Sequence, residues 1–312
     1  FNYIQTSLDA IVDADGNLGD GYTSSKLSLD DLRVGPALLY LYRETGDERY
    51  KTAASQLRGQ LASSPAPASR ASQQSRFMKT KTMAQPFYAE WTGMFDATNQ
   101  EIWDDIILQF DLIEEHCRNT TSNLLAHGYD ESKVASWADP VTGAAPHVWD
   151  RAVGWYAMAL VDVLDYLPVE HAGHAKLIGY LDTLADGLKR AQDATGGWWL
   201  VMDEPYPGME GNYIETSGTA MFAYALLKGG RLGYIDSATY QETAINAYDM
   251  LTEKYVVKNS AGELDWEGTV SVGSLGGDGS YEYYIAQELT QNDLKGVGTF
   301  IFLSVEKEAL GA

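Results

Sequence analysis

The segment that decides the fold is VWDRAVGWYAMALVDVLDYLP, residues 148–168, in which apolar side chains recur every three to four positions. This period places them on one face of a helix and predicts a helix over Ala152–Tyr166. The same period recurs along most of the chain, between loops rich in Gly, Asp and Pro. It predicts further helices over Val34–Tyr42, Trp103–Cys117, Ala175–Ala191, Thr216–Leu227, Ser237–Tyr255 and Asn292–Leu310. The protein is therefore expected to be all-α.

The predicted helices recur as pairs about every 50 residues, which indicates a repetitive helical architecture. Loops rich in aromatic residues follow at similar intervals, for example GWWLVMDEPYPGMEGNY (197–213) and WEGTVSVGSLGGDGSYEYY (266–284). Such an array, with long loops at one end, is more typical of an α/α toroid than of an open solenoid. No charge run or shift in composition marks a boundary, so residues 1–312 are expected to form a single domain. The low-complexity stretch 63–75 is predicted to be a flexible surface loop.

The composition argues against several classes of partner. The chain of 312 residues has 22 basic and 44 acidic residues, which gives a net charge of −22. A surface of that sign repels nucleic acid and anionic membranes, and no apolar run is long enough to span a bilayer. An acidic substrate would therefore need a locally basic site. The single cysteine, Cys117, allows no intrachain disulfide, and Asn119 begins a sequon that would carry an N-glycan if the chain is secreted.

The aromatic loops also contain Asp, Glu, Asn and Ser, and this mixture suits a sugar. Aromatic faces stack on the sugar ring while polar groups bond its hydroxyls. Trp198 is a candidate for such stacking, Glu215 for a bond to a hydroxyl, and Tyr281 for a wall of the cavity. The alternative is that the aromatic residues fill the interior of the toroid. The histidines show no spacing with acidic residues that is typical of a metal site.

Two neighbouring segments concentrate residues that could bind or catalyse. HGYDESKVASWADPVTG (127–143) contains His127 and Asp130. Asp150 and Arg151 stand at the start of the next predicted helix, where free backbone N–H groups already favour an anion. Arg151 has the fork geometry for a bidentate bond to a carboxylate. Two tryptophans flank it, Trp149 and Trp155. The alternative is that Asp150 caps the helix and pairs with Arg151.

These segments resemble glycoside hydrolase family 105, the unsaturated rhamnogalacturonyl hydrolases, and its fungal members in particular. The resemblance runs nearly end to end, through HGYDES, WADPVTG, HVWDRAVGWYAMALVDVLDYLP, GNYIETSGTAMFAYALLKG and GSYEYYIAQELTQNDLKGVG. SLDDLRVGPALLYLYRETGDERY (28–50) resembles the N-terminal helix pair of the family. The resemblance implies a six-fold α/α barrel with its site at one end, secretion, and no metal or organic cofactor.

The resemblance also implies a substrate and a reaction. The substrate is a short pectin fragment whose non-reducing end is a uronate with a double bond between C4 and C5. In the family an aspartic acid protonates C4 and water adds at C5, and the resulting hemiketal opens and expels the rest of the chain. This differs from attack at the anomeric carbon between two carboxylates. Carried over by position, the resemblance places His127 and Arg151 in the site, with Asp30, or Asp31 beside it, as a second aspartate.

This sequence departs from the family pattern at the position of the principal catalytic acid. That aspartate stands seven residues before the proline of a Pro-Phe-Tyr run, and counting back from Pro86 gives Lys79. No Asp or Glu lies between Glu48 and Glu90, so a small shift in alignment does not supply one.

Three interpretations follow from the lysine. Asp30 or Asp150 could donate the proton in a hydrolase, with a pKa raised by burial or by a neighbouring carboxylate. A neutral Lys79 could instead abstract the C5 proton of a uronate, as the base of a lyase. The third alternative is a barrel that binds acidic sugars without catalysis. The hydrolase is the expected function, because the other family residues persist.

Overall fold

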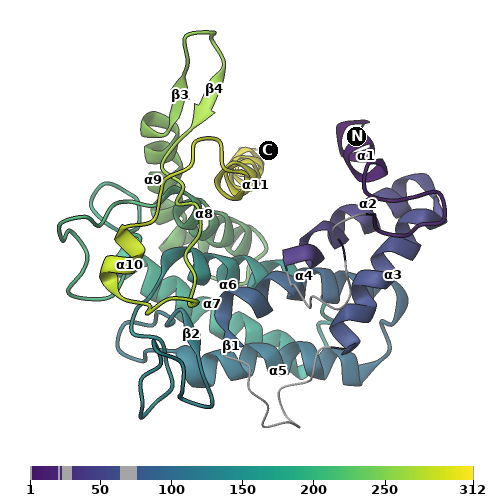
Figure 1. Ribbon diagram of the computed structural model, residues 1–312, viewed down its shortest axis with the longest axis horizontal. Helices are drawn as coiled ribbons and strands as arrows, with labels where there is room; N and C mark the ends of the chain where they lie inside the picture. Colours follow the sequence, from purple (N-terminus) through teal and green to yellow (C-terminus); the bar gives the residue numbers. More distant parts are fainter. Residues whose placement is uncertain (1, 20–21, 23–29, 64–75, 312) are drawn as a thin grey trace.

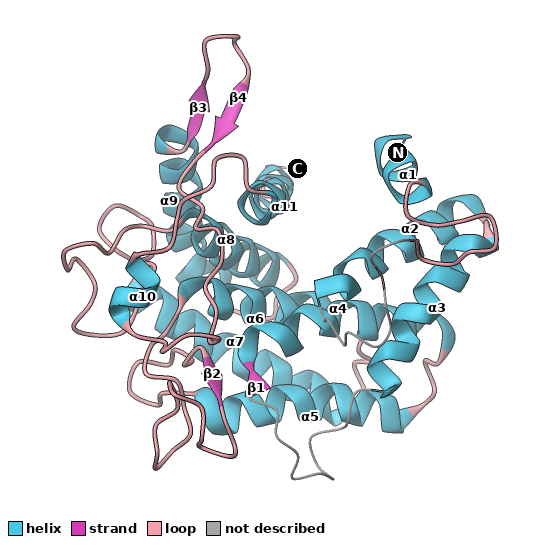
Figure 2. Ribbon diagram, in the orientation of Figure 1, coloured by secondary structure: helices cyan, strands magenta, loops and turns pink. Residues whose placement is uncertain are grey.

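The computed structural model describes residues 2–19, 22, 30–63 and 76–311, apart from the side chains of residues 30, 31, 62, 63 and 76–82. Within this part of the chain the structure is mostly helical (Figures 1 and 2). The helices are α1 (Asn2–Asp9), η2 (Asp30–Val34), α2 (Gly35–Thr45), α3 (Glu48–Ser63), α4 (Met78–Phe95), α5 (Gln100–Cys117), α6 (Asp150–Val163), α7 (Ala172–Ala191), α8 (Thr216–Arg231), α9 (Ser237–Lys254), α10 (Tyr281–Ile285) and α11 (Leu294–Ala309). Residues 64–75, in which a flexible loop is predicted, lie outside the described part.

Every helix predicted from the apolar spacing is present, with ends that differ by a few residues. The sequence pattern missed the long helices α3 and α4, and also α1 and the short helices η2 and α10. α3 is rich in small and polar residues and buries mainly Tyr50 and Leu57 as large side chains. α4 contains Pro86 in its interior, where proline removes a backbone donor and usually ends a helix. Burial of apolar residues of α4 on both sides, Phe87 and Tyr88 among them, outweighs that local preference.

The long helices form two layers (Figure 1). α2, α4, α6, α8 and α11 pack side by side in chain order, and each of α3, α5, α7 and α9 packs against the inner helix that precedes it. Nearly every residue of α6 and α8 is buried, whereas α7 and α9 bury one face. An inner layer that is apolar all round, covered by amphipathic outer helices, is the arrangement of an α/α barrel. The predicted fold class is confirmed.

Glycines allow the two central inner helices to approach closely. A Cβ atom on Gly154 of α6 would lie 2.6 Å from the sulfur of Met221 on α8. A Cβ atom on Gly218 of α8 would lie 2.1 Å from Oδ2 of Asp150 on α6. Larger residues at either position would push the helices apart, so these glycines fix the spacing around the start of both helices.

Ion pairs show that the inner helices run parallel. Lys228 near the end of α8 contacts Asp162 and Asp165 near the end of α6, each at 2.7 Å. Arg231, the last residue of α8, contacts Glu306 of α11, also at 2.7 Å. The starts of these helices therefore gather at the opposite end of the barrel, together with the long aromatic loops. The partial positive charges of their N-termini gather there too.

Two short antiparallel sheets complete the structure. β1 (Arg76–Phe77) pairs with β2 (Gly128–Tyr129), with Phe77 opposite Gly128. β3 (Val256–Lys258) pairs with β4 (Leu264–Trp266) in a hairpin that projects from the barrel in Figure 2. The β1–β2 pairing places the start of α4 beside the segment that follows His127.

The described helices include none that is long and apolar enough to cross a membrane. The described buried apolar residues form one large cluster around α5 to α9 and a smaller one around α1, α2 and α3, and α4 contributes to both. A third, small cluster in the loops consists of Trp137, Ala145 and Leu275. The single domain over residues 1–312 stays a prediction.

Candidate active site

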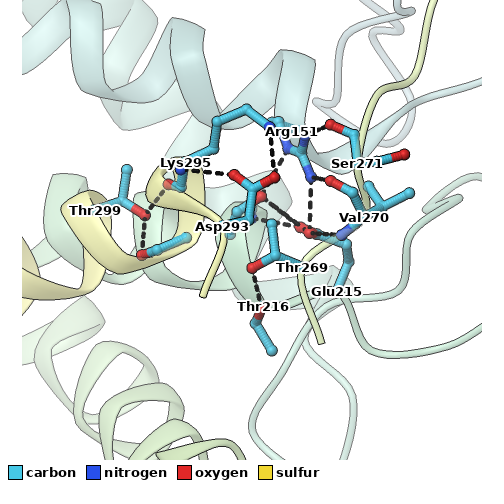
Figure 3. Close-up of polar contacts among 12 residues, drawn as sticks. Arg151, Glu215, Thr216, Thr269, Val270, Ser271, Asp293, Lys295 and Thr299 are labelled. Carbon is cyan, nitrogen blue, oxygen red and sulfur yellow. Dashed lines mark hydrogen bonds and ion pairs between the residues drawn. The ribbon is translucent and has the colours of Figure 1, made fainter. Parts of the chain in front are cut away.

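Arg151 lies in a buried polar network at the start of α6 (Figure 3). Its Nε donates to the hydroxyl of Ser217 at 2.7 Å, and a terminal nitrogen donates to Oε1 of Glu215 at 3.1 Å. The guanidinium also donates to the backbone carbonyls of Val270 and, at 3.2 Å, of Ser271. Arg151 and Glu215 are both fully buried. The charge of Arg151 is therefore neutralised inside the protein, and most of its donors are already used.

Glu215 joins three parts of the chain at this point. Besides Arg151, it accepts from the N–H of Gly218 at 2.7 Å, which caps α8, and from the N–H of Val270 at 3.0 Å. Burial alone would raise the pKa of Glu215, but the charge of Arg151 and these donors hold the pKa below its ordinary value. Glu215 is thus an ionised, fully bonded side chain of the interior, whereas the sequence suggested a contact with a sugar hydroxyl.

Asp150 is fully buried at the first position of α6, with its carboxyl against Gly218 of α8. Neither oxygen meets the geometry of a hydrogen bond to a described residue. Ionising a buried carboxyl that lacks donors is costly. Burial, and next the neighbouring Glu215 carboxylate, raise the pKa of Asp150 well above its ordinary value. Asp150 therefore keeps its proton to a higher pH than an ordinary aspartic acid, as suits a general acid, but it has no exposed surface.

An aromatic cluster lies beside this network. Nδ1 of His127 and the hydroxyl of Tyr284 are 2.5 Å apart. The His127 ring lies 4.7 Å from the indole of Trp149, which stacks on Tyr284 at 6.1 Å. Burial raises the pKa of Tyr284, so its hydroxyl stays protonated and can donate to Nδ1 when that nitrogen carries no proton. The structure thus brings together His127, Trp149 and Arg151, which the sequence placed in one site.

A second histidine, His147, pairs with a carboxylate, and this contact was not predicted from the sequence. Nδ1 of His147 lies 3.0 Å from Oδ2 of Asp203, whose other oxygen accepts from the N–H of Val148 at 2.7 Å. The His147 ring packs edge-on against Tyr206 at 4.7 Å, and Tyr206 stacks on Tyr281 at 4.6 Å. Tyr281 is therefore part of this loop packing, and its hydroxyl bonds a backbone carbonyl. The position of His147 directly before the VWDR motif was the available signal, but its partner lies far along the chain.

Arg33 is also absent from the site residues predicted from the sequence. Its guanidinium carbon lies 3.8 Å from the ring centroid of Trp155, one helical turn after Arg151 on α6. Arg33 is exposed, whereas Trp155 is 4% exposed. Trp155 thus stands near Arg151 as predicted, but beneath a second arginine.

Two residues that the sequence predicted to bind a sugar, Trp198 and Asp130, make their contacts within the protein. Trp198 is fully buried, and its Nε1 donates to the carbonyl of Leu188 at 2.9 Å, so its indole belongs to the core and has no free face for a sugar. The Asp130 carboxylate organises its own loop by accepting from the backbone N–H groups that follow it. These belong to Ser132, Val134 and Ala135.

Asp30 and Lys79 are placed only by their backbone. Asp30 is the first residue of η2, and Lys79 is the second residue of α4. Their side chains lie outside the described part of the structure. Because β1 pairs with β2, the start of α4 is at the same end of the barrel as His127.

The described side chains include no group of three or more His, Cys, Asp and Glu residues that could hold a metal ion. Asn119 is exposed, and its side-chain oxygen accepts from the N–H groups of Thr121 and Ser122. Whether it carries a glycan stays a prediction.

The chain is similar to known proteins over nearly its whole length. The model of Glycosyl Hydrolase Family 88 matches residues 1–310. A protein of Agrobacterium fabrum is 36% identical over 236 residues, which cover 72% of this chain and 97% of that protein. The unsaturated rhamnogalacturonyl hydrolase YesR of Bacillus subtilis is 26% identical over 230 residues, which cover 70% of this chain and 62% of that protein.

Solved structures show the same similarity. A glycoside hydrolase from family 105 of C. acetobutylicum superposes with a TM-score of 0.92 and 35% identity, over 99% of this chain and 87% of that chain. A glycosyl hydrolase of family 88 from Bacteroides vulgatus superposes with a TM-score of 0.70 at 18% identity, over 98% of this chain and 85% of that chain, which shows the shared fold.

Proposed function

This chain belongs to glycosyl hydrolase family 88, and from that premise we propose that it removes a 4,5-unsaturated uronic acid from the non-reducing end of pectin-derived oligosaccharides. It is a glycoside hydrolase related to family 105. The observation that carries the proposal is its 35% identity to a solved family 105 enzyme over 99% of the chain. The name of the B. subtilis relative, an unsaturated rhamnogalacturonyl hydrolase, supports this substrate class.

The proposed reaction consumes one water and needs no oxidant or reductant. A proton adds to C4 of the enol ether, and the hydroxyl of water adds to C5, which gives a hemiketal. The hemiketal opens to a ketone at C5 and leaves a hemiacetal at C1. The hemiacetal loses the remaining sugar chain as an alcohol and becomes an aldehyde. The step that the protein must catalyse is the proton transfer to C4, which needs a general acid within hydrogen-bond reach.

The acid of this proposal is Asp30 or Asp150, because position 79 is a lysine. Asp150 has the raised pKa, but it is fully buried and faces Gly218 and Glu215. A group that protonates substrate must touch it. The burial of Asp150 therefore favours Asp30 as the donor.

The test follows the absorbance of the conjugated enol-ether carboxylate in unsaturated oligosaccharides from lyase-digested rhamnogalacturonan. The natural chain, Asp30→Asn, Lys79→Asp and, as a surface control, Asp139→Asn are compared. Loss of absorbance with the natural chain and the control, but not with Asp30→Asn, is the expected result. An inert natural chain with an active Lys79→Asp variant would mean that the lysine switched the site off.

Two other outcomes would replace the proposal. New absorbance from saturated pectin chains would identify a lyase with Lys79 as base. Thermal stabilisation by the oligosaccharide without any change in absorbance would identify a sugar-binding barrel. An extracellular location and a closer similarity to fungal members belong to the proposal as well, and detection of the processed chain in a culture medium tests the location.

A further inference from the structure

We propose that His147, held by Asp203, forms a hydrogen bond with a hydroxyl of the neutral sugar that follows the uronate. His147 would then help to determine which oligosaccharide the protein binds. The class of substrate rests on the proposed function. The pair of side chains does not, because it follows from contacts between the segment that precedes α6 and the loop that contains Asp203.

Backbone pairing brings His147 and Asp203 together, although they stand 56 positions apart. Trp149 and Val201 form an antiparallel bridge. Two positions further along each segment, residues 147 and 203 face each other, because antiparallel partners run in opposite directions. Side chains two positions apart project to the same face of such a pairing. His147 therefore lies on the same face as Trp149, the tryptophan of the candidate site.

Asp203 fixes the orientation of the imidazole. Its Oδ2 lies 3.0 Å from Nδ1 of His147, and its Oδ1 accepts from the backbone N–H of Val148 at 2.7 Å. The carboxylate cannot turn away without losing this second bond. Because an ionised carboxylate only accepts, Nδ1 is the nitrogen that donates. The hydrogen bond of one ring nitrogen sets the direction and the role of the other, which here is Nε2.

Nε2 of His147 is open to a ligand. It has no hydrogen-bond partner among the described residues, and it is not enclosed by them either. The side chain of His147 is 9% exposed, so solvent reaches only a small part of the ring, which includes Nε2. A ligand atom at this point would meet one ring nitrogen in a fixed direction.

His147 borders the aromatic cluster that contains His127. The N–H of His127 donates to the carbonyl of His147 at 2.9 Å. The rings of His127 and His147 lie 5.8 and 6.3 Å from the ring of Tyr284, so both are neighbours of the same tyrosine. An oligosaccharide that binds beside His127 therefore has its next sugar within reach of His147.

The charges near His147 favour a neutral sugar over an anionic one. Asp203 is followed directly by the exposed Glu204. Glu210 returns to the aromatic cluster beside His147, where its carbonyl accepts from the hydroxyl of Tyr281 at 3.0 Å. These three acidic residues disfavour a carboxylate. A hydroxyl is uncharged and can donate or accept, so it suits Nε2 in either protonation state. The uronate is better placed nearer the helix N-termini, which favour an anion.

The test measures binding of two ligands that lack the double bond and are therefore not consumed by the proposed reaction. Galacturonate provides the uronate alone. A saturated disaccharide from rhamnogalacturonan, in which a neutral deoxy sugar follows galacturonate, adds the second ring. Calorimetry gives the dissociation constant of each ligand for the natural chain and for each variant, and circular dichroism confirms that each variant is folded.

Two variants separate the two ring nitrogens of His147. His147→Asn keeps an amide at the position of Nδ1, which can donate to Asp203, but it has no group at the position of Nε2. The longer side chain of His147→Gln places a polar amide where Nε2 stands. His171→Asn is the matched control, because His171 also pairs with an aspartate, Asp104 at 3.2 Å, and its side chain is similarly buried. It caps α7, which begins at the opposite end of the barrel.

The natural chain and His171→Asn are expected to bind the disaccharide more tightly than galacturonate. His147→Asn should bind the disaccharide about three- to tenfold more weakly, with galacturonate binding unchanged, and His147→Gln should lie between His147→Asn and the natural chain.

Four results would overturn the role of His147. These are unchanged disaccharide binding by His147→Asn, an equal loss for both ligands, which indicates packing alone, and a natural chain that gains nothing from the neutral sugar. The fourth is weaker disaccharide binding by His147→Gln than by His147→Asn, which would trace the loss to the contact with Asp203.

These outcomes are distinct from those of the hydrolase test. A loss confined to the disaccharide in His147→Asn, with an unsaturated chromophore that stays intact in the natural chain, supports the role of His147 and refutes the hydrolase. Consumption of the chromophore with an unchanged KM in His147→Asn supports the hydrolase and refutes the role of His147. A raised KM with an unchanged kcat supports both.

Discussion

Replacement of Asp150 by asparagine is expected to stabilise the protein by an amount that grows with pH. In the unfolded chain Asp150 ionises near its ordinary pKa of about 3.9. In the folded protein burial and the Glu215 carboxylate raise its pKa well above that value, so the folded state retains a proton that the unfolded state has lost. Between these two pKa values unfolding releases a proton, and rising pH therefore favours the unfolded state.

The slope of this effect follows from proton linkage. One proton released on unfolding lowers the free energy of unfolding by about 1.4 kcal/mol for each pH unit. Asparagine has a similar shape, cannot ionise and keeps donors near Glu215. The Asp150→Asn variant therefore releases no proton from this position on unfolding, and its stability lacks this dependence on pH. The stability of Asp150→Asn relative to the natural chain should therefore rise by about 1.4 kcal/mol per unit from pH 5 upwards, until the folded pKa is reached.

Urea denaturation at pH 5, 6, 7 and 8 measures this difference. Asp139→Asn is the control, because Asp139 is exposed and hydrogen bonds from the N–H groups of Thr142 and Val141 lower its pKa. Asp139 is ionised in both states over this range, so its variant should differ from the natural chain by a constant amount. A constant offset for Asp150→Asn as well would refute the protonated, buried state of Asp150.

Three further outcomes are expected. Tyr284→Phe removes the hydroxyl that bonds His127, and it should cost about 1 kcal/mol of stability in urea and shift the pH profile of kcat, whereas a packing role alone would leave that profile unchanged. Arg151→Met leaves Glu215 buried without its counter-charge and should cost about 3–5 kcal/mol by the same assay; a cost below about 1 kcal/mol would contradict the ion pair. Trp198→Phe should cost about 1–3 kcal/mol with KM unchanged, because the indole lies in the core, and a raised KM would instead place it on the sugar.

Local patterns predicted much of the fold, whereas the roles of the predicted site residues stay predictions. Apolar spacing located the central inner helices, because α6 and α8 bury continuous apolar surface. The motifs around His127 and Arg151 led to the correct family, because the residues of those motifs stand close together in the sequence. α3 and α4 were not predicted from the sequence because their helical state depends on tertiary burial. In α4 this burial outweighs the unfavourable effect of the interior proline Pro86.

The amino-acid sequence by itself determined the helical class, the acidic surface, the family and the lysine at position 79. Only the tertiary structure decided which polar groups are internal and which face solvent. Arg151 and Trp198 are typical binding residues by type, but contacts with distant segments enclose them. Arg33 is an ordinary loop residue by type, but the packing of α2, α4 and α6 brings its guanidinium onto Trp155. Burial and pairing depend on residues far apart in the chain, so the positions that bear charge toward solvent follow from packing.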